Sequence, residues 1–230
     1  MKPGQWLLEL LFPTRCILCR DFLDGGRPRI CPRCAERLPY TTDGGKSHGD
    51  FFSLCVSSVF YEKAMREAIL RYKFEGARAY APAFGILIAS TIYEQLEGKY
   101  DLISWVPLDA GRRRKRGYDQ AQLLAEQASA HLCRGCVRLL EKRRGVRPQS
   151  GTGSPERRRA NIAGAYRVID PAAVEGKRVL LIDDILTTGA TLGECVRILR
   201  EAGAKTVACA TLARAEENEK MNEIGSGANE

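Results

Sequence analysis

The chain has 230 residues, 44% of them hydrophobic and 28% charged, and its formal net charge is +8. This balance excludes a disordered chain, and the length predicts one domain with a small addition or one large domain. The positive charge is concentrated at residues 112–116, 142–147 and 157–159. Such clusters favour polyanionic ligands, nucleic acid among them, although some of these arginines are expected to be solvated surface.

The N-terminal residues 6–12 are apolar, but Glu9 interrupts this run and Pro13 ends it. The run is too short for a signal peptide or a membrane span, so we expect an amphipathic helix that packs on the rest of the chain. Nine cysteines in a chain without a secretory signal indicate metal binding rather than disulfides, and they predict a cytoplasmic protein.

Four of the cysteines form two pairs with zinc-ligand spacing, Cys16 with Cys19 and Cys31 with Cys34. Four thiolates hold tetrahedral Zn²⁺ and leave no open position for chemistry, so we expect a structural site. Because residues 1–50 offer little core, the metal would supply folding energy to this zinc-binding segment. The alternative is two unrelated buried pairs.

Hydrophobic periodicity after the polar stretch 41–50 predicts strands that alternate with helices. We expect strands at 55–61, 101–106, 137–140, 165–169, 178–184 and 205–213. We expect helices at 63–73, 79–96, 120–132 and 190–202, and a basic loop at 143–160. This order is typical of an α/β fold with a mostly parallel sheet flanked by helices. The fold would occupy residues 51–214, before a disordered acidic tail at 215–230.

Residues 179–191 carry the clearest chemical signal. The expected strand ends at Asp183 and Asp184, and a turn rich in Thr and Gly leads into the next helix. Ligands of open α/β sheets bind at the carboxyl ends of strands, and N–H groups and hydroxyls at a helix N-terminus suit a phosphate monoester. Gly189 would let the backbone approach the anion closely. The alternative is an ordinary strand–turn–helix without a ligand.

This segment resembles the phosphoribosyl pyrophosphate (PRPP) motif of type I phosphoribosyltransferases. The resemblance implies that Asp183 and Asp184 hold the 2′- and 3′-hydroxyls of the ribose. It also implies that the turn holds the 5′-phosphate, at Thr187, Thr188, Gly189, Ala190 and Thr191.

A four-cysteine segment followed by such a domain is the layout of the ComF family (competence protein F), which the GntX proteins share. The resemblance covers residues 5–214. Further similar stretches are 71–74, 106–120 and the loop residues Gln149, Arg157, Asn161, Gly164 and Ala165. The chain departs from the family at Asp109, where His is frequent, and at Asp119, where Asn is usual. An added carboxylate near a pyrophosphate repels it unless Mg²⁺ or arginine intervenes.

The resemblance implies a pyrophosphate loop at Pro107, Leu108, Arg112, Arg116 and Gly117. Guanidinium groups bind phosphate oxygens bidentately, which supports the two arginines on physical grounds. Further candidates for ligand contacts are Lys73, Arg143, Gln149 and Arg157, although Lys73 fits a surface lysine equally well. Mg²⁺ is expected together with PRPP.

Two classes of function stay open. As an enzyme, the chain would be a phosphoribosyltransferase in which a nucleophile displaces pyrophosphate from C1 of PRPP, and the sequence does not identify this acceptor. As a binding module, it would handle single-stranded DNA with a partner helicase in natural transformation, as proteins resembling ComF do. A PRPP-sensing regulator is a third interpretation, but the sequence offers no DNA-reading helix-turn-helix for it.

Overall fold

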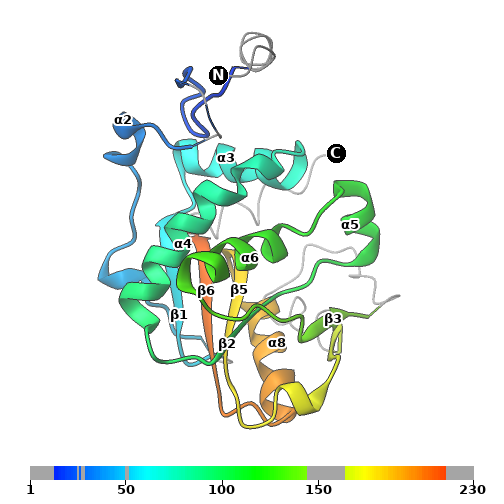
Figure 1. Cartoon of the computed structure of the whole chain (residues 1–230). Coiled ribbons are helices and arrows are strands. Elements are labelled where there is room, and N and C mark those ends of the chain that lie inside the picture. The colour runs from blue at the N-terminus through cyan, green and yellow to red at the C-terminus, as the bar shows by residue number, and fades with distance from the viewer. Residues whose placement is uncertain (1–12, 25, 27–28, 50–51, 144–163, 216–230) are drawn as a thin grey trace.

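The computed structural model describes residues 13–24, 26, 29–49, 52–143 and 164–215 (Figure 1). Its centre is a four-stranded parallel sheet with the strand order β1-β6-β5-β2. The strands of this sheet are β1 (Cys55–Phe60), β2 (Leu102–Trp105), β5 (Arg178–Leu186) and β6 (Thr206–Arg214). A separate antiparallel pair consists of β3 (Leu140–Lys142) and β4 (Tyr166–Val168). The parallel sheet confirms the predicted α/β fold.

Helices cover both faces of the parallel sheet (Figure 1). The helices α4 (Ala81–Leu96) and α6 (Gln120–Leu132) pack against one face, and α8 (Ala190–Glu201) packs against the other. The remaining described helices are α2 (Pro32–Ala35), α3 (Lys63–Phe74) and α5 (Ala110–Arg116), with short 3-10 turns at Asp43–Gly45, Arg78–Tyr80 and Pro171–Ala173. None of the helices in the described part of the chain is long and apolar enough to cross a membrane.

The side chains of β5 alternate between two halves of the core. Leu180 and Ile182 lie in the half formed with α4 and α6, whereas Val179 and Leu181 lie in the half formed with α8. Burial on both faces explains why this strand reads as a continuous apolar run. The first half also includes Ile17, so the N-terminal cysteine segment shares a core with the sheet domain.

The strand expected at 137–140 is displaced in the structure. The strand β3 begins at Leu140 and pairs with β4 instead of joining the parallel sheet. The residues before β3 form two backbone hydrogen bonds with the edge strand β2. Val137 N–H donates to the carbonyl of Ile103 at 2.8 Å, and Ile103 N–H donates to the carbonyl of Gly135 at 2.9 Å. The preceding residues therefore form a bridge at the sheet edge rather than a full strand.

The helix α5 was not expected from the periodicity, because residues 110–116 are small or basic and offer no apolar stripe. It begins after Asp109 and ends at Gly117, whose φ of +82° is left-handed. The helix expected at 6–12, most of the loop at 143–160 and all but Ala215 of the acidic tail lie outside the described residues. The division into residues 1–50, 51–214 and 215–230 stays a prediction.

Candidate functional site

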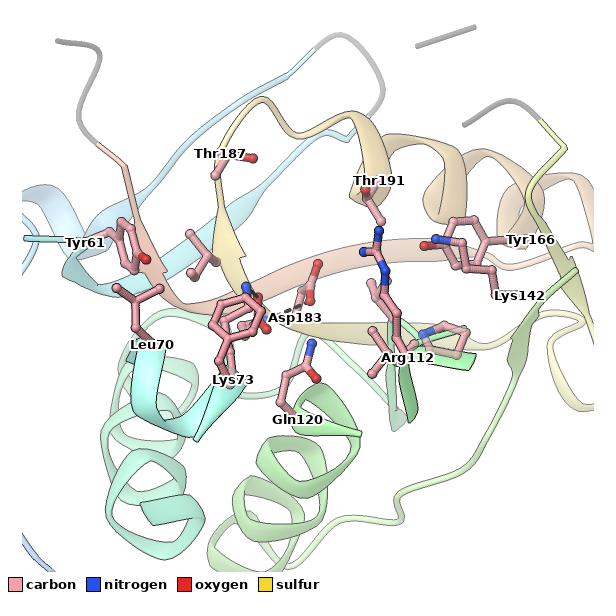
Figure 2. Close-up of a pocket in the computed structure, with 16 residues that line it drawn as sticks. Tyr61, Leu70, Lys73, Arg112, Gln120, Lys142, Tyr166, Asp183, Thr187 and Thr191 are labelled. Carbon is pink, nitrogen blue, oxygen red and sulfur yellow. Dashed lines mark hydrogen bonds and ion pairs between the residues drawn. The ribbon is translucent and has the colours of Figure 1, made fainter. Parts of the chain in front are cut away.

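The predicted strand–turn–helix is present at the carboxyl end of β5 (Figure 2). The helix α8 begins directly after Gly189, whose φ is +74°. A Cβ added at Gly189 would lie 2.7 Å from Cε1 of Phe52, which is buried. Glycine is therefore needed here for two reasons, the left-handed backbone and the close packing against an aromatic ring.

A cavity of about 410 Å³ opens at this end of the sheet. Eight of the predicted site residues line it: Lys73, Pro107, Leu108, Arg112, Asp183, Asp184, Thr187 and Thr191. They come from α3, α5, β5, α8 and the segments next to them. The fold thus brings together residues that are more than a hundred positions apart in the sequence, such as Lys73 and Asp184.

The two acids in this cavity have different partners. Asp184 is buried, and its Oδ1 accepts a hydrogen bond from Lys73 Nζ at 3.1 Å, whereas its Oδ2 is buried without a hydrogen-bond partner. Asp183 Oδ1 accepts from the backbone N–H of Asp184 at 2.8 Å. Burial, and then the charge of Asp184, raise the pKa of Asp183 well above its usual value. Lys73 forms an ion pair with Asp184, and no described cation forms one with Asp183, so the acid pair suits a divalent cation or the hydroxyls of a sugar.

Two capping carboxylates hold the segment between β2 and α6. Asp109 Oδ1 accepts from the backbone N–H of Arg112 at 2.9 Å, which caps α5. Asp119 is buried and accepts from the N–H groups of Leu108 at 2.8 Å and Gln122 at 3.2 Å. These are the two positions that depart from the family pattern, and neither lines the cavity. Both carboxylates face backbone donors, which reduces their repulsion of an anion in the cavity.

Arg116 and Gly117, both assigned to the pyrophosphate loop, lie beside the cavity and not in its wall. Arg116 Nη1 donates to Gln120 Oε1 at 2.5 Å, and its guanidinium carbon lies 4.9 Å from the centre of the Phe74 ring. Gln120 and Phe74 both line the cavity, so Arg116 contacts two side chains of the cavity wall from behind it. Gly117 supplies the left-handed turn that ends α5.

The remaining predicted residues fall into three places. Thr188 and Gly189 lie in the turn before α8 and Ala190 is the first residue of α8, where its N–H donates to Thr188 Oγ1 at 3.4 Å. They do not line the cavity. Arg143 lines a neighbouring cavity instead. Gln149 and Arg157 lie outside the described residues.

Part of the cavity wall was missed by sequence reasoning. Lys142 and Tyr166 enter it from β3 and β4, and Lys142 Nζ lies 5.2 Å from the centre of the Tyr166 ring (Figure 2). Burial, and then the charge of Arg112, lower the pKa of Lys142. The other side of the cavity in Figure 2 carries Tyr61 and Leu70, and Phe74 also lines the cavity. In this view Arg112 and Lys142 lie on one side of Asp183, and Tyr61 and Leu70 lie on the other.

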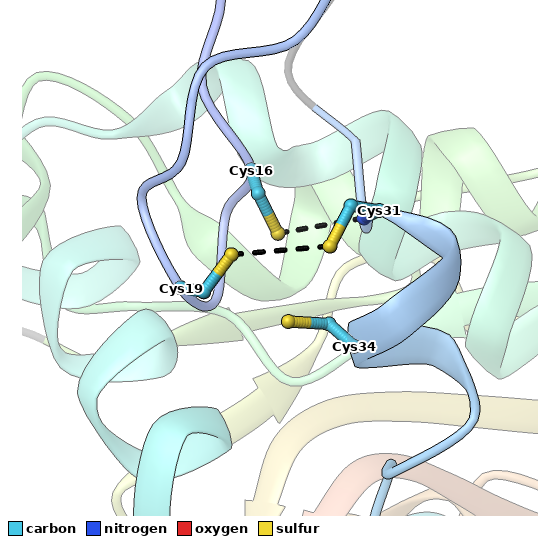
Figure 3. A group of neighbouring side chains, drawn as sticks. All are labelled: Cys16, Cys19, Cys31 and Cys34. Atoms are coloured by element: carbon cyan, nitrogen blue, oxygen red, sulfur yellow. Dashed lines mark hydrogen bonds between the residues drawn. The ribbon is translucent and has the colours of Figure 1, made fainter.

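The four predicted cysteine ligands meet at a second site (Figure 3). The sulfur atoms of Cys16, Cys19, Cys31 and Cys34 all lie within 4.8 Å of one another, and those of Cys19 and Cys31 are 3.8 Å apart. A tetrahedral zinc with sulfur at its usual distance separates its ligands by about 3.8 Å. The sulfur positions therefore fit a structural Zn²⁺.

The backbone around Cys16 also favours a thiolate. Burial acts to raise the pKa of this thiol, but backbone N–H groups, that of Cys31 foremost, lower the pKa to about 6. The N–H of Cys31 donates to Cys16 Sγ at 3.4 Å. Donors aimed at a sulfur stabilise its negative charge, which is the form that binds metal.

Comparison with known proteins matches two family models. Residues 85–225 match the phosphoribosyl transferase domain, and residues 7–45 match the double zinc ribbon domain. The first match contains the acid pair and the turn before α8, and the second contains all four cysteine ligands. The zinc ribbon match and the clustered cysteines together support structural zinc.

Several curated proteins are similar over most of the chain. Competence protein ComFC of Bacillus subtilis is 32% identical over 222 residues, which cover 90% of this chain and 88% of that protein. Competence protein ComFC of Streptococcus pneumoniae is 30% identical over 189 residues, which cover 82% and 78%. DNA utilization protein YhgH of Salmonella typhi is 32% identical over 193 residues, which cover 80% and 78%.

Proposed function

We propose a PRPP site for this chain, which belongs to the ComF family of proteins with a phosphoribosyltransferase domain and an N-terminal zinc ribbon. The observation that carries the proposal is the acid pair. Asp184 keeps a buried oxygen without a partner, and it lies in one cavity with the cations Arg112 and Lys142. An anionic sugar with free hydroxyls is complementary to such a cavity.

The parts of PRPP have distinct places in this proposal. The 5′-phosphate binds at the turn before α8, near Thr187 and Thr191, where the N-terminus of a helix favours an anion. The ribose hydroxyls face Asp183 and Asp184, and the pyrophosphate faces Arg112 and the loop before it. Mg²⁺ would be held by the carboxylate oxygens and would neutralise charge on the leaving pyrophosphate.

The chemistry that fits this arrangement is phosphoribosyl transfer. The bond from C1 of the ribose to pyrophosphate breaks, and a nucleophile forms a new bond to C1. Positive charge that develops on the ribose is stabilised by the nearby acids, while Arg112 and Lys142 stabilise the departing anion. The apolar side of the cavity, at Tyr61, Leu70 and Phe74, is open to the acceptor.

A second candidate is a nucleic-acid-binding module that binds PRPP without turnover. The Phe74 ring is 67% exposed and lies against the guanidinium of Arg116, and such a pair suits the stacking of an unpaired base. The relatives named for competence and DNA utilization support a role in the handling of imported single-stranded DNA. A helicase partner and a cytoplasmic location, which would keep the cysteine thiols reduced, belong to this proposal.

Calorimetric titration of PRPP into the zinc-loaded full chain, with and without Mg²⁺, tests the site. Asp184→Asn should lower the affinity by about tenfold or more, because it removes charge at the cation and sugar position. The matched control is Glu175→Gln, since Glu175 is exposed near the amino end of β5. Equal affinities for the wild type and Asp184→Asn would remove the site assignment.

A screen for pyrophosphate release then separates the two candidate functions. Release with any base or with single-stranded DNA, lost in Asp184→Asn, supports the transferase. PRPP or DNA binding without release supports the binding module. Unfolding curves of both variants confirm that each one is folded.

A further inference from the structure

A second cavity of about 420 Å³ adjoins the first one, and we call it the basic cleft. Its lining residues are Leu108, Ala110, Arg113, Arg138, Glu141, Lys142, Arg143 and Arg167. Leu108 and Lys142 line both cavities, so the two are neighbours across these side chains. The residues come from the loop before α5, from α5 itself and from the antiparallel pair of β3 and β4 with the residues next to it.

Among the residues that the structure describes, the charge of the basic cleft is unbalanced. Its lining holds five cationic side chains and one carboxylate, and this carboxylate, on Glu141, already forms an ion pair with Arg167. Arg113, Arg138 and Arg143 are exposed, and no described carboxylate forms an ion pair with any of them. Guanidinium groups that line one cavity without described ion-pair partners favour the binding of an anion from solution.

The shape and chemistry of the lining narrow the class of anion. Within the described wall, only Leu108 and Ala110 are apolar, and there is no aromatic ring on which a base would stack. Arginine binds two phosphate oxygens at once, and adjacent phosphates engage more than one guanidinium. The cleft is thus suited to a short chain of phosphates rather than to nucleobases.

We propose that the basic cleft is a second binding site for inorganic pyrophosphate, next to the PRPP cavity. The proposal rests on the proposed function, because pyrophosphate is the leaving group of that reaction. Lys142 borders both cavities and would contact the anion in either place, so the cleft receives pyrophosphate after it leaves the ribose. No bond changes in this step, since the anion only moves from one set of cations to another.

Calorimetric titration of inorganic pyrophosphate into the zinc-loaded full chain tests this proposal. We expect two sites in the wild type and a weakening of one of them by about tenfold or more in the double variant Arg113→Gln/Arg138→Gln. Neither arginine lines the PRPP cavity, so the other site and PRPP binding should be retained. The charge-matched control is Lys177→Gln/Lys205→Gln, at exposed positions near the amino ends of β5 and β6.

The outcomes separate this proposal from the proposed function. The proposal would be overturned by a single pyrophosphate site in the wild type. It would also be overturned by equal losses of pyrophosphate affinity in the cleft variant and the control variant. A cleft variant that loses affinity for oligothymidylate but not for pyrophosphate would assign the cleft to a DNA strand and also overturn the proposal. Asp184→Asn should weaken PRPP binding by about tenfold or more and keep the cleft site. Two pyrophosphate sites in a wild type that does not bind PRPP would contradict the PRPP proposal and the transfer of pyrophosphate between the cavities, and would leave the basic cleft only as a pyrophosphate site.

Discussion

The surroundings of Asp183, which are buried and adjacent to the carboxylate of Asp184, disfavour its ionised form. Because its pKa is raised in the folded state, the proton is held more tightly when the chain is folded than when it is unfolded. The stability from this effect is present below the unfolded pKa of about 4 and is lost as the pH rises through the folded value. At neutral pH this stability is reduced, because the unfolded chain releases the proton more readily than the folded chain does.

We predict that Asp183→Asn makes the domain more stable near pH 7, by roughly 1 kcal/mol, while it weakens PRPP binding. Asparagine keeps an Oδ1 that accepts from the Asp184 N–H, so the local hydrogen bond is preserved. Urea unfolding at neutral pH and at about pH 4 measures the effect, which should shrink at the lower pH. A gain that is equal at both pH values, or also present in Glu175→Gln, would contradict this explanation.

The residues of the site differ in how well the sequence identifies them. Asp183, Asp184 and the turn are contiguous, so a local pattern predicts where they lie. Lys142 and Tyr166 are separated in sequence, and they enter the cavity because β3 and β4 pair in antiparallel register, with these two residues opposite each other. The basic clusters of the sequence favour polyanionic ligands in general, but only the pairing of β3 with β4 shows that Lys142 borders this cavity.

At the scale of elements, caps explain which predictions hold. The helix α6 agrees with the expected 120–132, because Asp119 caps its start and Cys133 ends it in a left-handed conformation. The helix α5 has an equally clear cap at Asp109, yet it was missed because its basic residues give no periodic apolar face. A capping residue such as Asp109 can therefore indicate a helix even where hydrophobic periodicity is absent.

The turn before α8 yields a second prediction. Gly189→Ala should destabilise the chain by roughly 1–3 kcal/mol and weaken PRPP binding, because a Cβ meets both a left-handed backbone and the Phe52 ring. The matched control is Gly176→Ala, where φ is +69° but nothing lies within 4 Å of an added Cβ. Thermal unfolding and PRPP titration of both variants measure the difference. Equal destabilisation of the two would show that the contact with Phe52 is unimportant.

At the scale of the whole molecule, the zinc segment and the sheet domain are joined by more than the chain. Arg71 Nη2, on α3, donates to the carbonyl of Ile17 at 2.8 Å, and Arg20 Nη1 donates to the hydroxyl of Tyr80 at 2.8 Å. Ile17 itself is fully buried in the core that the two parts share. The helix α3 also carries Lys73, so the zinc segment supports the element that contacts the acid pair.

Loss of zinc should therefore affect the PRPP cavity as well as the N-terminal segment. We predict that Cys16→Ser, or removal of the metal by a chelator, abolishes the single bound Zn²⁺, lowers the unfolding temperature of the whole chain and weakens PRPP binding. The control is Cys133→Ser, because Cys133 is exposed and lies outside the cysteine cluster. Metal analysis, calorimetric unfolding and PRPP titration provide the three readouts. Coupling through a shared core requires the zinc segment and the sheet domain to lose stability together. A metal-free chain in which the sheet domain unfolds in a separate step at an unchanged temperature, with unchanged PRPP affinity, would show that the two parts are independent.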